Sequence, residues 1–226
     1  MLKKHIKYII LLLCIPTVIG LGNSLFDDRQ YAFITLAIVI LSSIPFFLTF
    51  ENNNRNTYKM VIIAVMVAMS VAGRFIFAVI PGFKPITAIV VITAIYFGCE
   101  VGFLTGSLSA VISNFYFGQG PWTPFQMFTW GLIGLLAGKF SFVLKTNRFI
   151  LAIYGALVGI LYSFLMDIWT VLWYDNQFHI KLYLVAIVSS LPYTMIYAIS
   201  NIIFLLCLAK PIGDKLLRIK SKYGIN

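Results

Sequence analysis

The chain has 226 residues, of which 61% are hydrophobic and only 11% are charged, and its mean hydropathy is +0.95. Soluble domains carry roughly a quarter charged residues, so this composition excludes an ordinary soluble domain and predicts an all-α polytopic membrane protein. The formal net charge is +10, but the basic residues lie in short runs between apolar stretches. This distribution is typical of a membrane protein, and it gives no reason to expect a nucleic-acid partner.

Eight apolar segments are expected to form transmembrane helices. The polar linker Glu51–Thr57 separates two of them from the rest, so we expect residues 1–57 to hold two N-terminal helices with the linker. Residues 58–226 are expected to form a six-span core with a basic cytoplasmic tail. The segments are Tyr8–Leu21, Tyr31–Phe50, Tyr58–Ile80, Ile86–Phe97, Val101–Phe117, Phe125–Leu144, Phe149–Trp173 and Leu182–Leu208, and the tail is Lys210–Lys222. Ile86–Phe97 is shorter than the roughly 20 residues that a crossing helix needs.

The distribution of lysine and arginine predicts the orientation of these spans. With the N-terminus in the cytoplasm and eight crossings, thirteen of the 17 basic residues fall on the inner side. Cytoplasmic loops carry such an excess of positive charge. We therefore expect a multi-pass protein of the cell membrane with both termini in the cytoplasm.

Two turns on the expected outer side are rich in proline and glycine. They are PGFKP at Pro81–Pro85 and GQGPWTP at Gly118–Pro124. Irregular backbone has no hydrogen-bond partners in hydrocarbon, so these turns mark membrane boundaries.

All four tryptophans fall on the outer side in this topology. They are Trp122, Trp130, Trp169 and Trp173. An interfacial aromatic belt is one explanation, but a belt is expected on both faces of the membrane. The asymmetry favours an aromatic-lined pocket that opens to the outside and holds a planar or bulky organic ligand.

Two charged residues fall inside apolar spans. Arg74 lies near the outer end of its span, and Asp167 lies in the outer half of another. A lone charge in the membrane is costly, so we expect the two to form an ion pair. The pair could join two helices or form the floor or gate of the pocket.

Small residues recur at helical spacing in several spans. Ala64, Ala68 and Ala72 stand four residues apart and share one helix face. Such faces allow close helix contact, either within the chain or with a partner helix.

Catalytic and metal-binding patterns are not found. His5 and His179 stand at the ends of spans, and no GxxxxGK[ST] motif occurs. We therefore expect no enzyme activity, no cofactor and no metal site. If ATP drives a process here, the ATPase is another chain.

The segment Tyr58–Leu208 resembles an S component, the substrate-binding subunit of an energy-coupling factor (ECF) vitamin transporter. The resemblance rests on the alanines at 64, 68 and 72, on the two capped outer turns, and on a compact basic chain without an ATPase motif. The stretch GPWTPFQMFTWGLIG resembles S components associated with cobalamin in particular. The resemblance implies docking of the alanine face on a transmembrane T-subunit, two ATPase subunits as further partners, and closure of the outer turns over a vitamin.

On this basis we expect the chain to capture a vitamin on the outer face, with cobalamin as the first expectation. A corrinoid would suit a wide aromatic pocket with amide partners. The candidate substrate-binding residues are Arg74, Lys84, Asn114, Gln119, Trp122, Gln126, Trp130, Asp167 and Tyr193.

Two alternatives stay open. The ligand could be riboflavin, a queuosine precursor or another small metabolite within the same family. The chain could instead be a membrane assembly protein that binds no ligand and uses its small-residue faces only for helix contacts. The sequence does not decide what the two N-terminal spans do.

Overall fold

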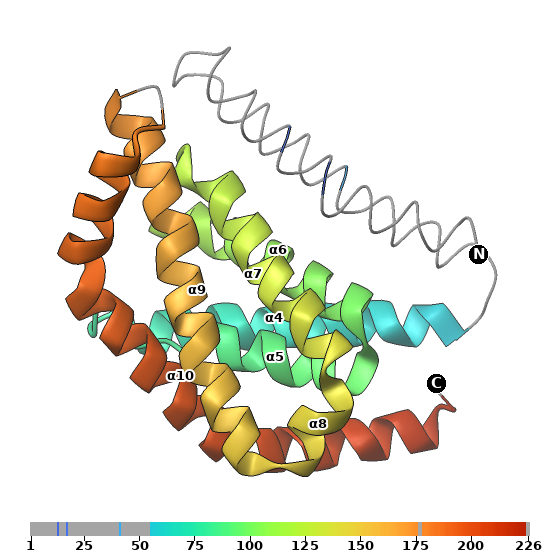
Figure 1. Cartoon of the computed structure of the whole chain (residues 1–226). Helices are drawn as coiled ribbons and strands as arrows, with labels where there is room; N and C mark the ends of the chain where they lie inside the picture. The colour runs from blue at the N-terminus through green and yellow to red at the C-terminus, as the bar shows by residue number, and fades with distance from the viewer. Residues whose placement is uncertain (1–12, 14–16, 18–40, 42–54, 176–177, 225–226) are drawn as a thin grey trace.

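The computed structural model describes residues 13, 17, 41, 55–175 and 178–224, and this part of the chain is helical without any strand (Figure 1). The two expected N-terminal helices lie almost wholly outside the described residues. The described helices are α4 (Arg55–Ile76), α5 (Ile86–Phe97), α6 (Cys99–Phe117), α7 (Trp122–Lys139), α8 (Ser141–Thr146), α9 (Arg148–Asp175) and α10 (Ile180–Lys222).

The predicted all-α polytopic fold is confirmed. Within the described residues, three helices are long and apolar enough to cross a membrane, namely Thr57–Ile76 of α4, α9 and α10. The six expected core spans correspond in order to α4, α5, α6, α7, α9 and α10, and α8 is a short additional helix.

Helix α5 is the central element of the fold. Every residue from Ile86 to Ile95 is buried, and α4, α6, α7, α8 and α10 all contact this helix. Its apolar residues are spread around the whole circumference, as expected of a helix enclosed by protein. Because its neighbours rather than lipid surround it, α5 can be shorter than a spanning helix.

Helices α6 and α7 approach each other through glycines. A Cβ atom added at Gly134 would fall against the carbonyl group of Gly102, and one added at Gly106 would fall against the carbonyl of Trp130. Small residues at such contacts let two backbones come close together. This contact fixes α7, which carries several side chains of the site described below, against α6.

The end of the chain differs from the prediction. The last span was expected to stop at Leu208, but α10 continues to Lys222 and includes the basic tail. A helix of 43 residues is about 65 Å long, roughly twice the hydrocarbon thickness of a bilayer. Figure 1 shows that α10 curves, so that its last part runs beneath the other helices. Pro192 and Pro211 lie inside it, and prolines are the usual sites of helix bending.

Contacts at the base of the molecule hold this last part of α10. The ring of Tyr223 stacks on Tyr58 at 4.6 Å, and Lys220 Nζ donates a hydrogen bond of 3.2 Å to the carbonyl oxygen of Tyr96. The sixth predicted span also ends earlier than expected, because α7 stops at Lys139 and α8 begins at Ser141.

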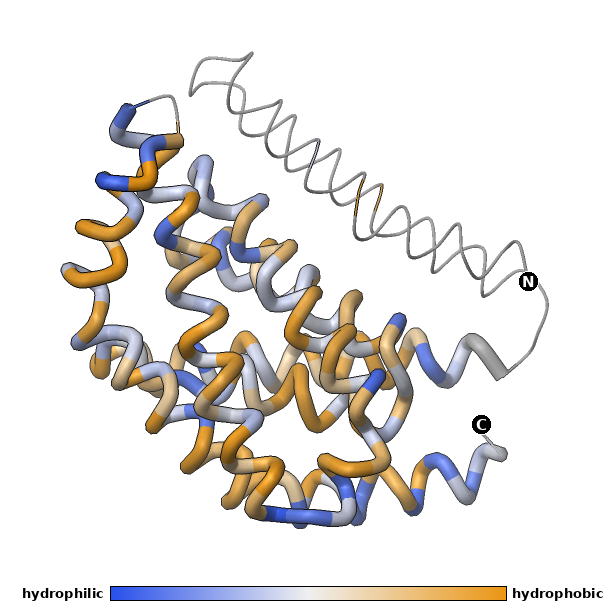
Figure 2. Tube along the Cα trace, in the orientation of Figure 1, coloured by the Kyte–Doolittle hydropathy of each residue, from blue (hydrophilic) through white to orange (hydrophobic). Residues whose placement is uncertain are grey.

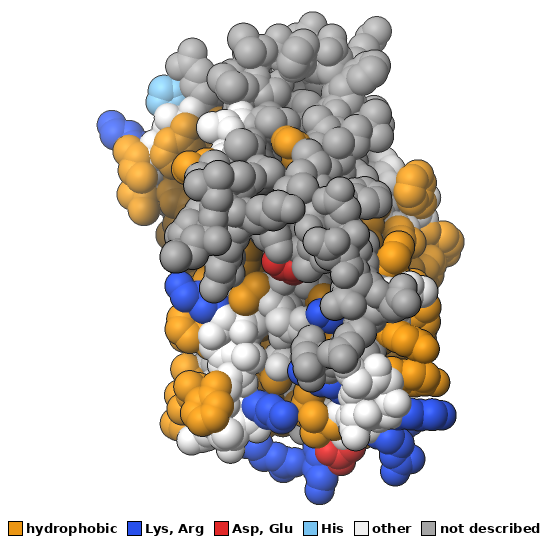
Figure 3. Space-filling model, turned by 90° about the vertical axis from the view of Figure 1, so that its right-hand side faces the viewer, with side chains coloured by type: hydrophobic (Ala, Val, Ile, Leu, Met, Phe, Trp, Pro, Cys, Tyr) orange, Lys and Arg blue, Asp and Glu red, His pale blue; other side chains and the backbone are white. Residues whose placement is uncertain are grey.

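Polar and basic residues gather at this base. Hydrophilic positions mark the α8–α9 connection and the end of α10 (Figure 2), and lysines and arginines cluster at the same end of the face shown in Figure 3. The long helices above the base are mainly apolar. Figure 2 also shows hydrophilic positions at the opposite end, near the end of α9 and the start of α10, so polar residues mark both ends, while basic residues concentrate at the base in Figure 3.

The α6–α7 contact gives a first prediction. Gly134→Ala should destabilise the protein by about 1–3 kcal/mol, because the added methyl group has no room against the Gly102 backbone. Thermal unfolding in detergent should show a midpoint lowered by several degrees. Val188→Ile adds one carbon at an exposed position of α10 and serves as the control. Equal midpoints for both variants would contradict the close contact.

Candidate ligand-binding site

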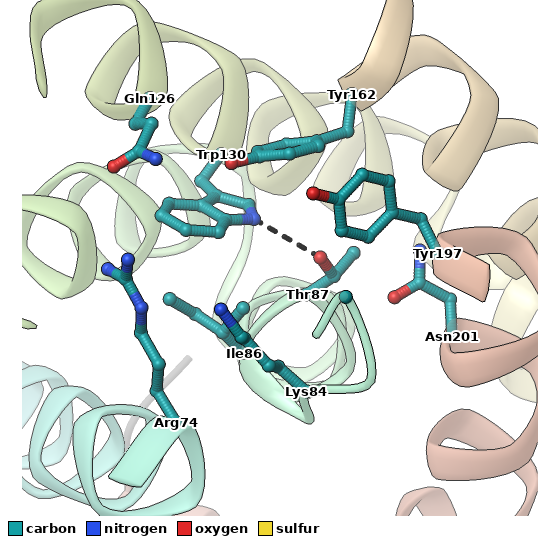
Figure 4. A pocket seen from close by; sticks show the side chains of 10 residues that line it. Arg74, Lys84, Ile86, Thr87, Gln126, Trp130, Tyr162, Tyr197 and Asn201 are labelled. Carbon is teal, nitrogen blue, oxygen red and sulfur yellow. Dashed lines mark hydrogen bonds between the residues drawn. The ribbon is translucent and has the colours of Figure 1, made fainter. Parts of the chain in front are cut away.

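A cavity of about 80 Å³ lies where the end of α4, the start of α5 and the middle of α7, α9 and α10 meet (Figure 4). The connection between α4 and α5, residues 77–85, contributes two further residues. The lining residues are Arg74, Gly82, Lys84, Ile86, Thr87, Gln126, Trp130, Tyr162, Tyr197 and Asn201.

Three aromatic residues from three different helices form one wall of the cavity. Trp130 of α7 stacks on Tyr162 of α9 with ring centroids 5.0 Å apart, and Tyr162 meets Tyr197 of α10 edge to face at 5.2 Å. The indole Nε1 of Trp130 donates a hydrogen bond of 3.2 Å to Thr87 Oγ1. The ring wall is thereby held in place from α5 as well.

Arg74 faces this wall from α4 (Figure 4). Its Nη1 donates hydrogen bonds to Ser113 Oγ and, at 2.8 Å, to Asn114 Oδ1 of α6. Its guanidinium carbon lies 4.5 Å from the ring centre of Phe117 and 5.7 Å from that of Trp130, distances at which cation–π attraction acts. In the part of the chain that the structure describes, the groups that hold this charge are therefore neutral.

Lys84 supplies a second cation from the 77–85 connection. Its ammonium lies 5.8 Å from the ring centre of Phe117. Burial lowers the pKa of Lys84, and the positive charge of Arg74 lowers it further. The cavity therefore concentrates positive charge in a partly dehydrated place.

The 77–85 connection is fastened to α10. The backbone N–H of Lys84 donates to Ser200 Oγ at 3.0 Å, and Ser200 Oγ donates to the carbonyl of Lys84 at 3.3 Å. Phe77 and Phe83 pack on Phe204 with centroid distances of 5.0 and 4.9 Å. Gly82 has φ of 78°, a conformation that side chains other than glycine rarely adopt, and it lies against α10. The connection therefore covers one side of the cavity.

Asn114 connects Arg74 to α7. Its Oδ1 accepts from Arg74, while its Nδ2 donates to Thr123 Oγ1 at 2.9 Å and to Gln126 Oε1 at 2.8 Å. All amide atoms of this buried residue are therefore used within the protein. Asn114 positions Arg74 and Gln126 from behind the cavity rather than lining it.

The structure brings four of the predicted site residues to the cavity: Arg74, Lys84, Gln126 and Trp130. Three others lie outside its lining. Asn114 stands behind it, Gln119 donates to the carbonyl of Val111, and Trp122 packs edge to face on Trp169.

The remaining two, Asp167 and Tyr193, line a separate groove of about 540 Å³ between α9 and α10. Asp167 accepts a hydrogen bond of 2.7 Å from Ser190. The predicted ion pair between Arg74 and Asp167 is not formed, because each residue is held by other partners. The sequence places the two charges at a similar depth in the membrane, but it does not determine whether the helix faces that carry them meet.

Sequence reasoning missed Thr87, Tyr162, Tyr197 and Asn201 as lining residues. Each is a polar group inside an otherwise apolar span, a signal that points to a protein-facing or cavity-facing position. The spacing of tyrosines and amides in such spans does not show which of them converge.

Comparison with known families identifies the family of this chain. Residues 54–212, well over half of the chain, match the family described as ECF-type riboflavin transporter, S component. The chain belongs to this family. No curated protein and no solved structure matches it.

The resemblance to ECF S components is thereby confirmed, whereas the cobalamin type is not supported by the match. An S component is a membrane substrate-binding subunit of a transporter and not an enzyme. The apolar helices agree with this membrane location.

The Asn114 network gives a second prediction. Asn114→Ala should lower the free energy of unfolding by about 1–3 kcal/mol, because buried donors of Arg74 and acceptors of Gln126 lose their partner. Thermal unfolding in detergent measures the effect. Ser189→Ala is the control, since Ser189 is exposed and bonds the carbonyl of Val185 in its own helix. A midpoint for Asn114→Ala that matches this control would contradict the assigned role.

Proposed function

We propose that this S component binds riboflavin or a close flavin relative in the cavity between α4, α7, α9 and α10. The observation that carries the proposal is the convergence of Trp130, Tyr162 and Tyr197 on one cavity. Aromatic faces hold planar ring systems by stacking, and a few polar groups then fix the orientation. The family description names riboflavin, which agrees with this chemistry.

The size of the cavity indicates that the ligand enters by displacement of a covering segment. Ligand pockets commonly measure about 300–1,000 Å³, several times the volume of about 80 Å³ found here. The 77–85 connection is the candidate cover, because its polar attachment to α10 runs through the single side chain of Ser200. Cobalamin, the first expectation from the sequence, is much larger than a flavin and would require a wider opening.

For transport, we propose that the chain works with a transmembrane T-subunit and two ATPases. Ala64, Ala68 and Ala72 are all exposed on α4, together with Val61, Val65 and Met69. This smooth apolar face suits close packing against a partner helix. The basic base of the molecule supports a cytoplasmic location for the C-terminus, with the cavity toward the outside.

Ligand titration tests the proposed binding function. Purified protein should bind riboflavin, and Trp130→Ala should weaken this binding by at least about tenfold, because the stacking face is lost. Trp173→Ala is the control, since Trp173 is exposed and does not line the cavity. Isothermal titration calorimetry gives both affinities.

The same titration separates the alternatives. Binding of cobalamin without riboflavin would overturn the flavin proposal and restore the first expectation. A folded protein that binds no vitamin would favour the ligand-free assembly role.

A substitution on the alanine face tests docking. Ala68→Trp should leave riboflavin binding unchanged, because Ala68 is exposed and does not line the cavity, and should abolish ATP-driven uptake in cells that contain all subunits. The bulky ring prevents close helix approach. Val188→Trp, at an exposed position on α10, is the matched control. Normal uptake by Ala68→Trp would refute this docking surface.

A further inference from the structure

We infer that the cavity takes a ligand with an anionic phosphate group, held between Arg74 and Lys84. This inference rests on the proposed flavin site and narrows its substrate class. It favours a phosphorylated flavin over uncharged riboflavin.

The charges that line the cavity do not balance. The cavity lining contains two cations and no carboxylate among the described residues. Asp167 lines the separate α9–α10 groove and accepts a hydrogen bond from Ser190. Two like charges in one partly buried place repel each other, and an anion between them removes that repulsion.

Arg74 carries a hydrogen-bond donor that no described residue uses. The side chain is only 7% exposed, yet its Nε has no hydrogen-bond partner among the described residues, whereas Nη1 bonds Ser113 and Asn114. Buried polar groups are almost always hydrogen-bonded, so an orphaned donor in a cavity lining points to a missing acceptor. Phosphate oxygens match the geometry of a guanidinium particularly well.

Lys84 lines the same cavity from the 77–85 connection. Burial and the charge of Arg74 both lower its pKa, and the described lining of the cavity holds no carboxylate that could stabilise the ammonium. Lys220, at the base of the molecule, has a hydrogen-bond partner within the protein, because its ammonium donates to the Tyr96 carbonyl. Lys84 also lies on the connection that covers the cavity, where contact with an anion would add to the attachment at Ser200.

The test compares flavin mononucleotide with riboflavin on the purified full chain. Flavin mononucleotide should bind at least about tenfold more tightly, as expected when a charged group gains hydrogen bonds from two cations. Lys84→Met should reduce this preference to about threefold or less, and Lys84→Arg should restore most of it. Lys181→Met, which removes an exposed cation at the start of α10, should leave it unchanged. The wild-type comparison needs no variant, so a folding defect in Lys84→Met does not affect it.

The outcomes are distinct. Tight riboflavin binding with equal or weaker binding of flavin mononucleotide would overturn this inference and leave the proposed function standing. Absence of binding of either flavin would overturn both. A third outcome is that millimolar inorganic phosphate strengthens riboflavin binding about tenfold, while flavin mononucleotide is not preferred. This outcome would contradict a phosphate group carried by the ligand and would assign the site to the free ion.

Discussion

A buried positive charge constrains the site more than any other feature. Arginine is almost never buried unless it is paired, yet Arg74 is buried in an apolar bundle, where its described hydrogen-bond partners are neutral and Lys84 is a second cation in the same cavity. Ser113 and Asn114 accept its hydrogen bonds, and the ring faces of Phe117 and Trp130 lie within cation–π distance. These partners come from α6 and α7, whereas Arg74 itself is part of α4. The interactions of one guanidinium group therefore fix three helices relative to one another.

The same network extends the constraint to the ring wall. Asn114 bonds both Arg74 and Gln126, and the glycine contact between α6 and α7 sets the distance over which Asn114 can do so. Trp130 is then held between Tyr162 and Thr87. A packed aromatic wall on one side and a loop attached through Ser200 on the other would suit the proposed function, in which a ligand is both admitted and retained. The aromatic side would supply stacking, and the loop side supplies the second cation.

Part of this site was predictable from single residues. Arg74, Lys84, Gln126 and Trp130 were proposed because a charge in a span, a basic turn, an amide and an outer tryptophan each suggest a ligand. Asn114 was proposed for the same reason, but its atoms are all used by neighbours. Asp167 and Tyr193 lie at suitable positions along their helices but face a different groove. A small error in helix rotation or curvature is enough to move a side chain from one cavity to another.

The sequence by itself determined the class of protein, the order of its core helices and the polar turns between them. Polar backbone in lipid must be hydrogen-bonded within its own segment, so apolar stretches form helices and polar turns lie at the membrane boundaries. It also indicated the family through short patterns near α4 and α7. Only the tertiary structure decided that Tyr162, Tyr197 and Asn201 meet Trp130, that Arg74 and Asp167 stay apart, and that α10 continues beneath the bundle. These outcomes depend on helix rotation, close glycine contacts and bending, which arise from packing among segments distant in the chain.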